Sequence, residues 1–306
     1  MNMKELIKHT VQQITKEIEN CFQCPAGIGK RRKGLTPSAR QTIHQITDDM
    51  IAIIFPGCHG PEIPPERLEE YLNEKLYSVM STLHEQVRRA FEYQCNFERC
   101  DKCNDCDKRA ENAVKQLLES LPSIIKTLRQ DIIAAYEGDP AARSTMEVVM
   151  SYPCIYAIAV YRIAHVLYEA GVPLIPRVMT EHAHSKTGID IHPGAKIGSG
   201  FFIDHGTGVV IGETCVIGNN VKIYQGVTLG ALSFEKDANG NPIKGIKRHP
   251  NVGDNVVIYA GATILGGDTT IGSNSEIGGN VWLIHSVPPN SKVYNRQPRP
   301  LIKQKK

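Results

Sequence analysis

The feature that most constrains the fold of this chain is a six-residue period in its last third. Apolar side chains recur at every sixth position from residue 191, and a second series runs two positions later. Neither the 3.6-residue period of a helix nor the alternation of a strand gives this spacing. Short repeats of this kind predict a parallel β-helix, whose stacked coils bury one shared apolar column. The first series is Ile191, Ile197, Ile203, Val209, Cys215, Val221 and Val227, and the second is Ile211, Ile217, Ile223 and Leu229.

The repeat is interrupted once, by a turn-rich excursion over residues 231–249. Apolar positions resume at Val252, and after Ile264 they shift by one residue to Ile271. The shift predicts a bulged corner between these two isoleucines. A β-sandwich would instead alternate polar and apolar residues, with turns at intervals of roughly eight to twelve residues. The period therefore favours the β-helix.

Residues 1–185 show helical patterns instead. Apolar residues at intervals of three and four predict helices over 64–93, 110–138 and 144–171, the first of them opened by two prolines. We therefore predict an α+β protein with three parts: a helical domain at 1–185, a β-helix at 186–290 with its excursion, and a basic tail at 291–306. The helical domain can cover one open end of the β-helix, which would otherwise be prone to aggregate.

Charge and hydropathy exclude some classes of function. The chain has 35 Lys and Arg against 32 acidic residues, a net charge of +3, which is too balanced for a nucleic-acid-binding face. The first twenty residues lack the apolar core of a secretory signal. The most apolar stretch, 148–167, contains Ser151, Pro153, Arg162 and His165, so we expect a buried helix and no membrane span. A cytoplasmic protein is expected.

Four of the nine cysteines lie within twelve residues. In a reducing compartment they are expected to be free thiols or metal ligands before disulfides. Their spacing is compatible with zinc or an iron–sulfur centre, with Cys21 and Cys24 as further ligands, but we favour the alternative, a reduced, charged segment without metal. The four are Cys95, Cys100, Cys103 and Cys106.

Polar side chains that intrude into the repeat are the candidates for chemistry. They come in pairs, and two of the pairs fall at the ends of apolar runs, where the coil turns. We expect these pairs at the edges of the coil, where a ligand can reach them. The intruding residues are Asp190, His192, Asp204, His205, Arg248 and His249.

These residues lie in motifs that resemble those of the serine O-acetyltransferases in the hexapeptide acyltransferase superfamily. The resemblance covers roughly residues 135–290 and rests on EGDPAA, GIDIHPGAKIGSGFFIDHGTGVVIGET, QGVTLGA and KRHPNVGDNVVIYAGATILGG. It implies a left-handed, three-sided β-helix. It also implies transfer of an acetyl group from acetyl-CoA to the hydroxyl of L-serine, which gives O-acetylserine and CoA in the first step of cysteine biosynthesis.

The resemblance assigns roles to individual residues. His205 is similar to the general base, a task that suits an imidazole, whose pKa lies near neutrality, and Asp190 to the carboxylate that orients it. Arg248 suits the carboxylate of the amino-acid substrate, because a guanidinium can bind a carboxylate through two parallel hydrogen bonds. In the family the site lies between protomers of a trimer, so a homotrimer or a dimer of trimers is implied. The substrate ammonium is assigned to Asp139 and Asp204, and its carboxylate to Arg248 and His249.

The acetyl-CoA arm is implied to run along small residues that allow close backbone approach, with no tightly bound cofactor. Basic residues on the excursion and the tail are candidates for its phosphates, or form a solvated basic surface. Two departures from the family stand out: Ala231 replaces a glycine, and the ending IKQKK replaces the terminal isoleucine of partner-binding members. The second puts association with O-acetylserine sulfhydrylase in doubt. The small residues are Gly230, Ala231, Ala260 and Gly261, and the basic ones Lys236, Lys244, Lys247 and Arg296.

Three other functions are alternatives to this one. The acceptor could be homoserine or an amino sugar. A γ-carbonic-anhydrase-like lyase would need zinc on three histidines, and the ligand pair separated by four residues is missing after residue 181. A non-catalytic scaffold would have no reason to place charged pairs at coil edges.

Overall fold

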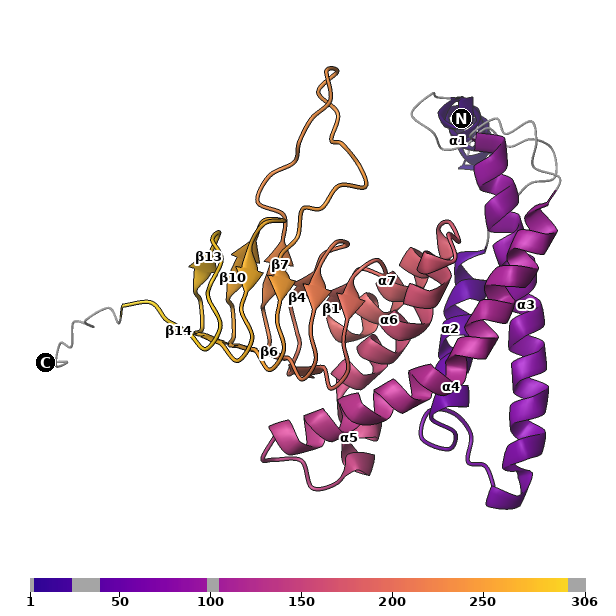
Figure 1. Ribbon diagram of the computed structural model, residues 1–306. Helices are drawn as coiled ribbons and strands as arrows, with labels where there is room; N and C mark the ends of the chain where they lie inside the picture. The colour runs from indigo at the N-terminus through magenta and orange to yellow at the C-terminus, as the bar shows by residue number, and fades with distance from the viewer. Residues whose placement is uncertain (1–2, 24–38, 98–104, 297–306) are drawn as a thin grey trace, which may run out of the picture.

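A computed structural model describes residues 3–23, 39–97 and 105–296 of the chain. Helices occupy the N-terminal part, and a stack of short strands follows them (Figure 1). This confirms the predicted α+β class. The helices are α1 (Met3–Gln23), α2 (Arg40–Ile54), the 3-10 turn η1 (Pro65–Arg67), α3 (Leu68–Phe97), α4 (Cys106–Gly138), α5 (Thr145–Ser151), α6 (Pro153–Glu169) and α7 (Ile175–Thr187).

The single helix expected over 144–171 was wrong, because the chain bends at Tyr152. Helix α5 ends at Ser151 and α6 begins at Pro153, with a turn of 76° between them. Proline has no backbone N–H and disfavours helical backbone in the residue before it, so it starts a helix more easily than it continues one. Tyr152 has extended backbone angles accordingly. Most of α6 is buried, as expected.

Among the described residues no single helix is long and apolar enough to cross a membrane. The pair α5 and α6 meets the length and composition limits only when taken together across its bend.

The strands form three parallel sheets that make the three faces of a β-helix (Figure 1). We name them by their strand order: face A is β1-β4-β7-β10-β13, face B is β2-β5-β8-β11, and face C is β3-β6-β9-β12-β14. The strands are β1 (Ile189–Ile191), β2 (Lys196–Ile197), β3 (Phe202–Asp204), β4 (Val209–Ile211), β5 (Val216–Ile217), β6 (Lys222–Tyr224), β7 (Thr228–Gly230), β8 (Asn251–Val252), β9 (Val257–Ile258), β10 (Thr263–Leu265), β11 (Thr270–Ile271), β12 (Glu276–Ile277), β13 (Trp282–Leu283) and β14 (Lys292–Val293).

Register explains why the sequence shows two apolar series. Ile191 pairs with Ile211, and Ile211 pairs with Leu229, so the first coil is two residues longer than the second. The extra residues lie in the corner between β3 and β4, which contains His205. The bulged corner expected before Ile271 is also confirmed, because one additional residue separates Ile264 from Ile271 there and Gly266 has φ 103°.

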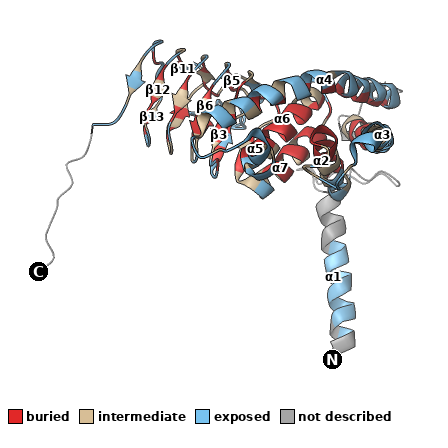
Figure 2. Ribbon diagram, turned by 90° about the horizontal axis from the view of Figure 1, so that it is seen from below, coloured by how far each residue is buried: buried red, intermediate tan, exposed pale blue. Residues whose placement is uncertain are grey.

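Helices α4, α6 and α7 contact the first coil and bury its open end (Figure 2). Arg162 of α6 donates to both carboxylate oxygens of Asp131 on α4, at 2.7 and 2.9 Å, and to the carbonyl of Gly198. The same Asp131 carboxylate accepts from the backbone N–H of Phe201. Two helices and the first coil are thereby joined by one buried ion pair.

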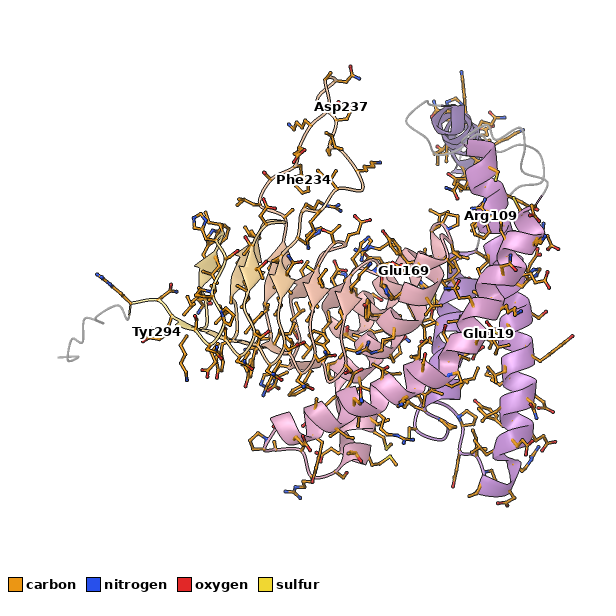
Figure 3. The ribbon with its side chains drawn as sticks, in the orientation of Figure 1. Arg109, Glu119, Glu169, Phe234, Asp237 and Tyr294 are labelled. Carbon is orange, nitrogen blue, oxygen red and sulfur yellow. The ribbon has the colours of Figure 1, made fainter. Side chains whose placement is uncertain are left out.

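The excursion at residues 231–249 projects far from the coils as an arm (Figures 1 and 3). Lys236 and Pro242 form an antiparallel bridge within it. The apolar side chains of Leu232 and Phe234 are 52% and 63% exposed. The arm leaves the coil after β7 of face A and rejoins it before β8 of face B. It therefore presents apolar surface beside these two faces.

Candidate active site

One cluster of polar side chains lies at the edge where face C turns into face A, called here the CA edge (residues 204–208, 225–227 and 259–262). The Asp204 carboxylate ends β3, with Lys222 Nζ 3.1 Å from its Oδ2 and His205 Nε2 3.8 Å from its Oδ1. His205 has φ 59° and a side chain that is 72% exposed. Gly206 is required next to it, because a Cβ there would lie 2.5 Å from Ile189 Cδ1.

The helical domain brings a second carboxylate to this edge. Asp139 caps α4, and its oxygens accept from the Tyr152 hydroxyl at 2.5 Å and from the backbone N–H of Ala141 at 2.9 Å. The Tyr152 hydrogen bond lowers the pKa of Asp139 and raises that of Tyr152 to about 12. Lys222 Nζ donates to the carbonyl of Gly138 at 2.7 Å, so one ammonium links Asp204 to the end of α4. Asp139 and Asp204 are therefore fixed at one edge.

A second cluster lies at the edge where face A turns into face B, called here the AB edge (residues 192–195, 212–215, 230–250 and 266–269). Arg248 pairs with Glu213, whose other oxygen accepts from the Tyr168 hydroxyl at 2.7 Å. Burial raises the pKa of Glu213, but these two hydrogen bonds outweigh it and the pKa is lowered. His192, whose pKa is lowered chiefly by burial, interacts electrostatically with Glu213 and Arg248.

His249 lies flat against the backbone of this edge. A Cβ on Gly212 would come within 2.1 Å of its ring, so only glycine fits there. The backbone N–H of Thr214 donates to His249 Nδ1 at 3.1 Å. Burial, followed by the Arg248 charge, lowers the pKa of His249 to about 4. The imidazole is therefore neutral, with Nδ1 as acceptor and Nε2–H free to donate.

Asp190 points outward from face A, where α7 covers it. Its carboxylate accepts from Arg177 Nη1 at 2.8 Å, and Arg177 also pairs with Glu181. Within the described chain, Glu181, His184 and Asp190 are the one group of three or more potential ligands spaced closely enough to hold a metal ion, and Arg177 already supplies a positive charge there. Among the described contacts, the Asp190 carboxylate pairs with Arg177 and not with His205.

The structure thus divides the expected site residues between the two edges that flank face A. His205, Asp204 and Asp139 lie at the CA edge, and Arg248 and His249 lie at the AB edge. One copy of the chain does not bring these two halves together. The outward row of face A that separates them runs from Asp190 to Trp282 through Val210, Thr228 and Thr263, and Trp282 is 66% exposed.

The small residues expected to lie along acetyl-CoA are divided in the same way. Gly230 and Ala231 lie at the AB edge, where the arm leaves β7, and Ala260 and Gly261 lie at the CA edge. The backbones of Gly208, Gly226 and Gly261 stack along this edge, so that a Cβ on Gly208 would lie 3.6 Å from the Cα of Gly226, and one on Gly226 would lie 3.5 Å from the Cα of Gly261. This leaves a strip without side chains along the CA edge.

The basic residues expected to bind the phosphates of acetyl-CoA differ in how exposed they are. Lys247 Nζ donates to the carbonyl of Thr214, and burial lowers its pKa. Lys236 and Lys244 are exposed on the arm, and Arg296 is exposed near the end of the described chain. Residues 297–306, with the IKQKK ending, lie outside the described residues, as do Cys24, Cys100 and Cys103.

Sequence reasoning missed the residues that hold the candidate side chains in place. These residues come from helices or from other coils, and no short motif links them to the sites that they contact. Only Glu213 and Thr214 were signalled, by their places in the motif GVVIGET. The residues are Tyr152, Tyr168, Arg177, Glu213, Thr214 and Lys222.

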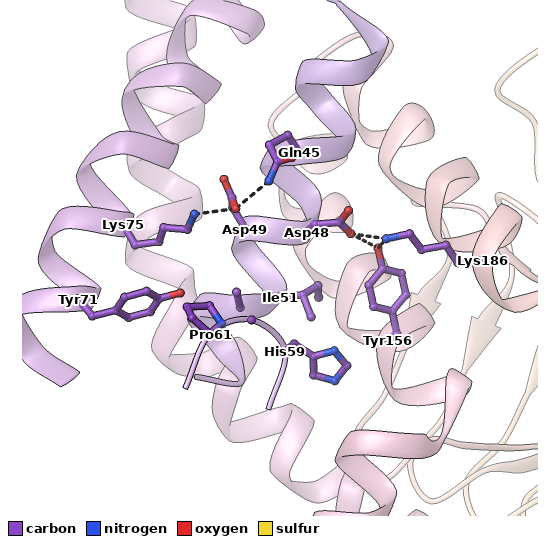
Figure 4. A pocket seen from close by; sticks show the side chains of 12 residues that line it. Gln45, Asp48, Asp49, Ile51, His59, Pro61, Tyr71, Lys75, Tyr156 and Lys186 are labelled. Atoms are coloured by element: carbon purple, nitrogen blue, oxygen red, sulfur yellow. Dashed lines mark hydrogen bonds and ion pairs between the residues drawn. The ribbon is translucent and has the colours of Figure 1, made fainter. Parts of the chain in front are cut away.

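A separate polar pocket of about 370 Å³ lies in the helical domain between α2, α3, α6 and α7 (Figure 4). Asp48 accepts from Tyr156 at 2.6 Å and from Lys186 at 2.6 Å, and Asp49 pairs with Lys75 at 2.8 Å. The charged groups of this pocket are thus paired with one another. They tie α2 to α6 and α7 and are not candidates for catalysis.

Comparison with known proteins identifies the family of this chain. No family model matches the chain. A plasmid-encoded serine acetyltransferase of Synechococcus elongatus is 47% identical over 264 residues, which cover 85% of this chain and 82% of that protein. The chain belongs to the serine acetyltransferase family. A serine acetyltransferase of Staphylococcus aureus is 49% identical over 170 residues, which cover 56% of this chain and 74% of that protein.

Solved serine acetyltransferases share the architecture. Serine acetyltransferase 1 of Entamoeba histolytica, in complex with L-cysteine, is 37% identical with a TM-score of 0.70, covering 84% of this chain and 99% of its own. The Neisseria gonorrhoeae serine acetyltransferase in complex with serine is 30% identical with a TM-score of 0.53, covering 88% and 100%. The family membership expected from the sequence motifs is confirmed.

Proposed function

We propose that this chain transfers the acetyl group of acetyl-CoA to the hydroxyl of L-serine and releases O-acetylserine and CoA. The observation that carries this proposal is the pairing of two carboxylates at one edge of face A with a guanidinium and a neutral imidazole at the other. A free amino acid carries an ammonium and a carboxylate, so its binding site needs acidic groups for the first and hydrogen-bond donors such as a guanidinium for the second.

His205 acts as the general base. Its Nε2 accepts the proton of the serine hydroxyl while the hydroxyl oxygen attacks the thioester carbonyl, and the tetrahedral intermediate collapses with cleavage of the C–S bond. The proton then passes from the imidazolium to the leaving thiolate, so that CoA leaves as a thiol. Asp190 is the proposed orienting carboxylate, which requires it to exchange Arg177 for His205 when substrate binds. Catalytic hydrogen bonds are often absent or long without substrate.

We propose that the two halves of the site, the CA edge and the AB edge, meet between neighbouring protomers. A cyclic arrangement brings the CA edge of one protomer against the AB edge of the next, because head-to-tail contacts close into rings. The exposed Trp282 and Val210 on the face between these edges support such a contact. We therefore propose a homotrimer, alone or as a dimer of trimers. Acetyl-CoA is an intracellular metabolite, which supports the cytoplasm as its location.

A thiol-release assay with acetyl-CoA and a panel of acceptors tests the activity. The panel contains L-serine, L-homoserine, L-threonine and glucosamine, and products are identified by mass spectrometry. We expect L-serine to give a kcat/KM at least about tenfold above each other acceptor, since a site that hydrogen-bonds one substrate rejects misfitting analogues. Preference for another acceptor, or thiol release without any, would overturn the proposal.

A further inference from the structure

Two cysteine thiols meet where α3 and α4 pack together, outside the proposed active site. Cys95 lies in the last turn of α3, and Cys106 is the first residue of α4. Their Sγ atoms are 3.6 Å apart. Cys106 is 8% exposed and Cys95 is half-buried. The two thiols thus come together from two helices at a largely enclosed position.

The distance between the sulfurs fits two ligands of one ion. Zinc binds thiolates at about 2.3 Å, and two corners of a tetrahedron with that radius are roughly 3.8 Å apart. A disulfide would need the sulfurs at about 2.05 Å. In an iron–sulfur cube each cysteine binds a different iron, which sets the sulfurs farther apart than two ligands of a single ion.

The position of Cys106 favours its thiolate form. It opens a helix of 33 residues, and the Asp105 side chain before it makes no capping hydrogen bond. The unpaired N–H groups and the dipole of a helix N-terminus attract negative charge. Two neighbouring thiolates would repel each other without a cation between them. The helix end therefore favours the Cys106 thiolate, and a cation between the two sulfurs would offset the repulsion between the two thiolates.

We propose that Cys95 and Cys106 supply two thiolate ligands to a single Zn²⁺ ion that joins the end of α3 to the start of α4. Both thiols lose their protons on binding, so the site releases two protons for the ion that it takes up. The ion has a structural role, because these helix ends lie outside both edges that carry the candidate catalytic residues.

Metal analysis of the full chain, purified without oxygen and without chelator, tests this site. We expect about one zinc per chain in the wild type and less than about one tenth in the double variant Cys95→Ser/Cys106→Ser, because serine is a poor zinc ligand. Cys58→Ser, which removes another half-buried thiol of the helical domain, is the matched control and should keep its zinc.

Two further measurements keep the test decisive if the double variant folds poorly. Cys95→His retains a zinc-binding side chain and should keep the metal. After exchange of zinc for Co²⁺, the same variant should show a weaker thiolate-to-cobalt absorption band than wild type. Wild-type protein without zinc, zinc retained in the double variant, or stoichiometric iron in its place would each overturn the proposal.

Discussion

At the scale of single residues, His205 is placed by an enlarged corner. The two extra residues between β3 and β4 push the imidazole out of the regular coil, where a substrate can reach it. We expect His205→Ala to lower kcat by about 10²- to 10⁴-fold, the range for loss of a general base, with folding intact. Steady-state kinetics check this, with the exposed His285→Ala as control. Unchanged turnover in His205→Ala would contradict the proposed role of His205 as general base.

Lys222 is a positioning residue by its contacts, since it reaches both Asp204 and the carbonyl before Asp139. Burial lowers its pKa, but hydrogen bonds to Tyr224 and Asp204 outweigh this and raise it, so the ammonium is charged. We expect Lys222→Met to raise the KM for serine about tenfold with little change in kcat or in the KM for acetyl-CoA. Lys222→Arg should restore part of the loss. An equal rise in both KM values would indicate general distortion instead.

His249 makes stability depend on pH. The folded imidazole has its pKa lowered to about 4 from the ordinary 6.5, so between these values the unfolded chain binds the proton and the folded chain does not. Its contribution is complete above pH 6.5 and is lost as the pH falls toward 4. Denaturant unfolding at pH 7 and pH 4 should show a loss up to about 3 kcal/mol larger in wild type than in His249→Gln. Equal losses would contradict this.

At the scale of elements, the ion pair of Asp131 and Arg162 holds the helical domain on the first coil. Asp131 is fully buried and Arg162 nearly so. Removing the carboxylate leaves a buried guanidinium without its partner, so Asp131→Ala should lower the free energy of unfolding by about 3 to 5 kcal/mol. Asp131→Ala/Arg162→Met should recover part of this loss. Denaturant titration measures both, and a double variant no more stable than Asp131→Ala would argue against the pair.

At the scale of the whole molecule, the proposed site closes only where the two edges of face A belong to different copies of the chain. His205→Ala and Arg248→Ala damage opposite edges, so a mixed trimer contains interfaces with both residues intact. Random assembly of equal amounts should recover about one quarter of wild-type activity. Mixing His205→Ala with Asp204→Ala is the control, because these residues share one edge and no interface is then intact. Without recovery in the first mixture, the divided site would be refuted.

The sequence by itself determined the β-helix and the candidate catalytic and binding pairs, because a six-residue period and the adjacent residues of Asp204-His205 and Arg248-His249 are local along the chain. It also predicted the bulged corner before Ile271, whereas the enlarged corner at His205 was found from the strand register. Only the tertiary structure decided which side chains hold these pairs. Gly138 and Lys222 are 84 residues apart in the sequence, and Asp190 meets Arg177 through the packing of α7 on the first coil. Contacts of this kind depend on how separate elements pack, and no local pattern records them.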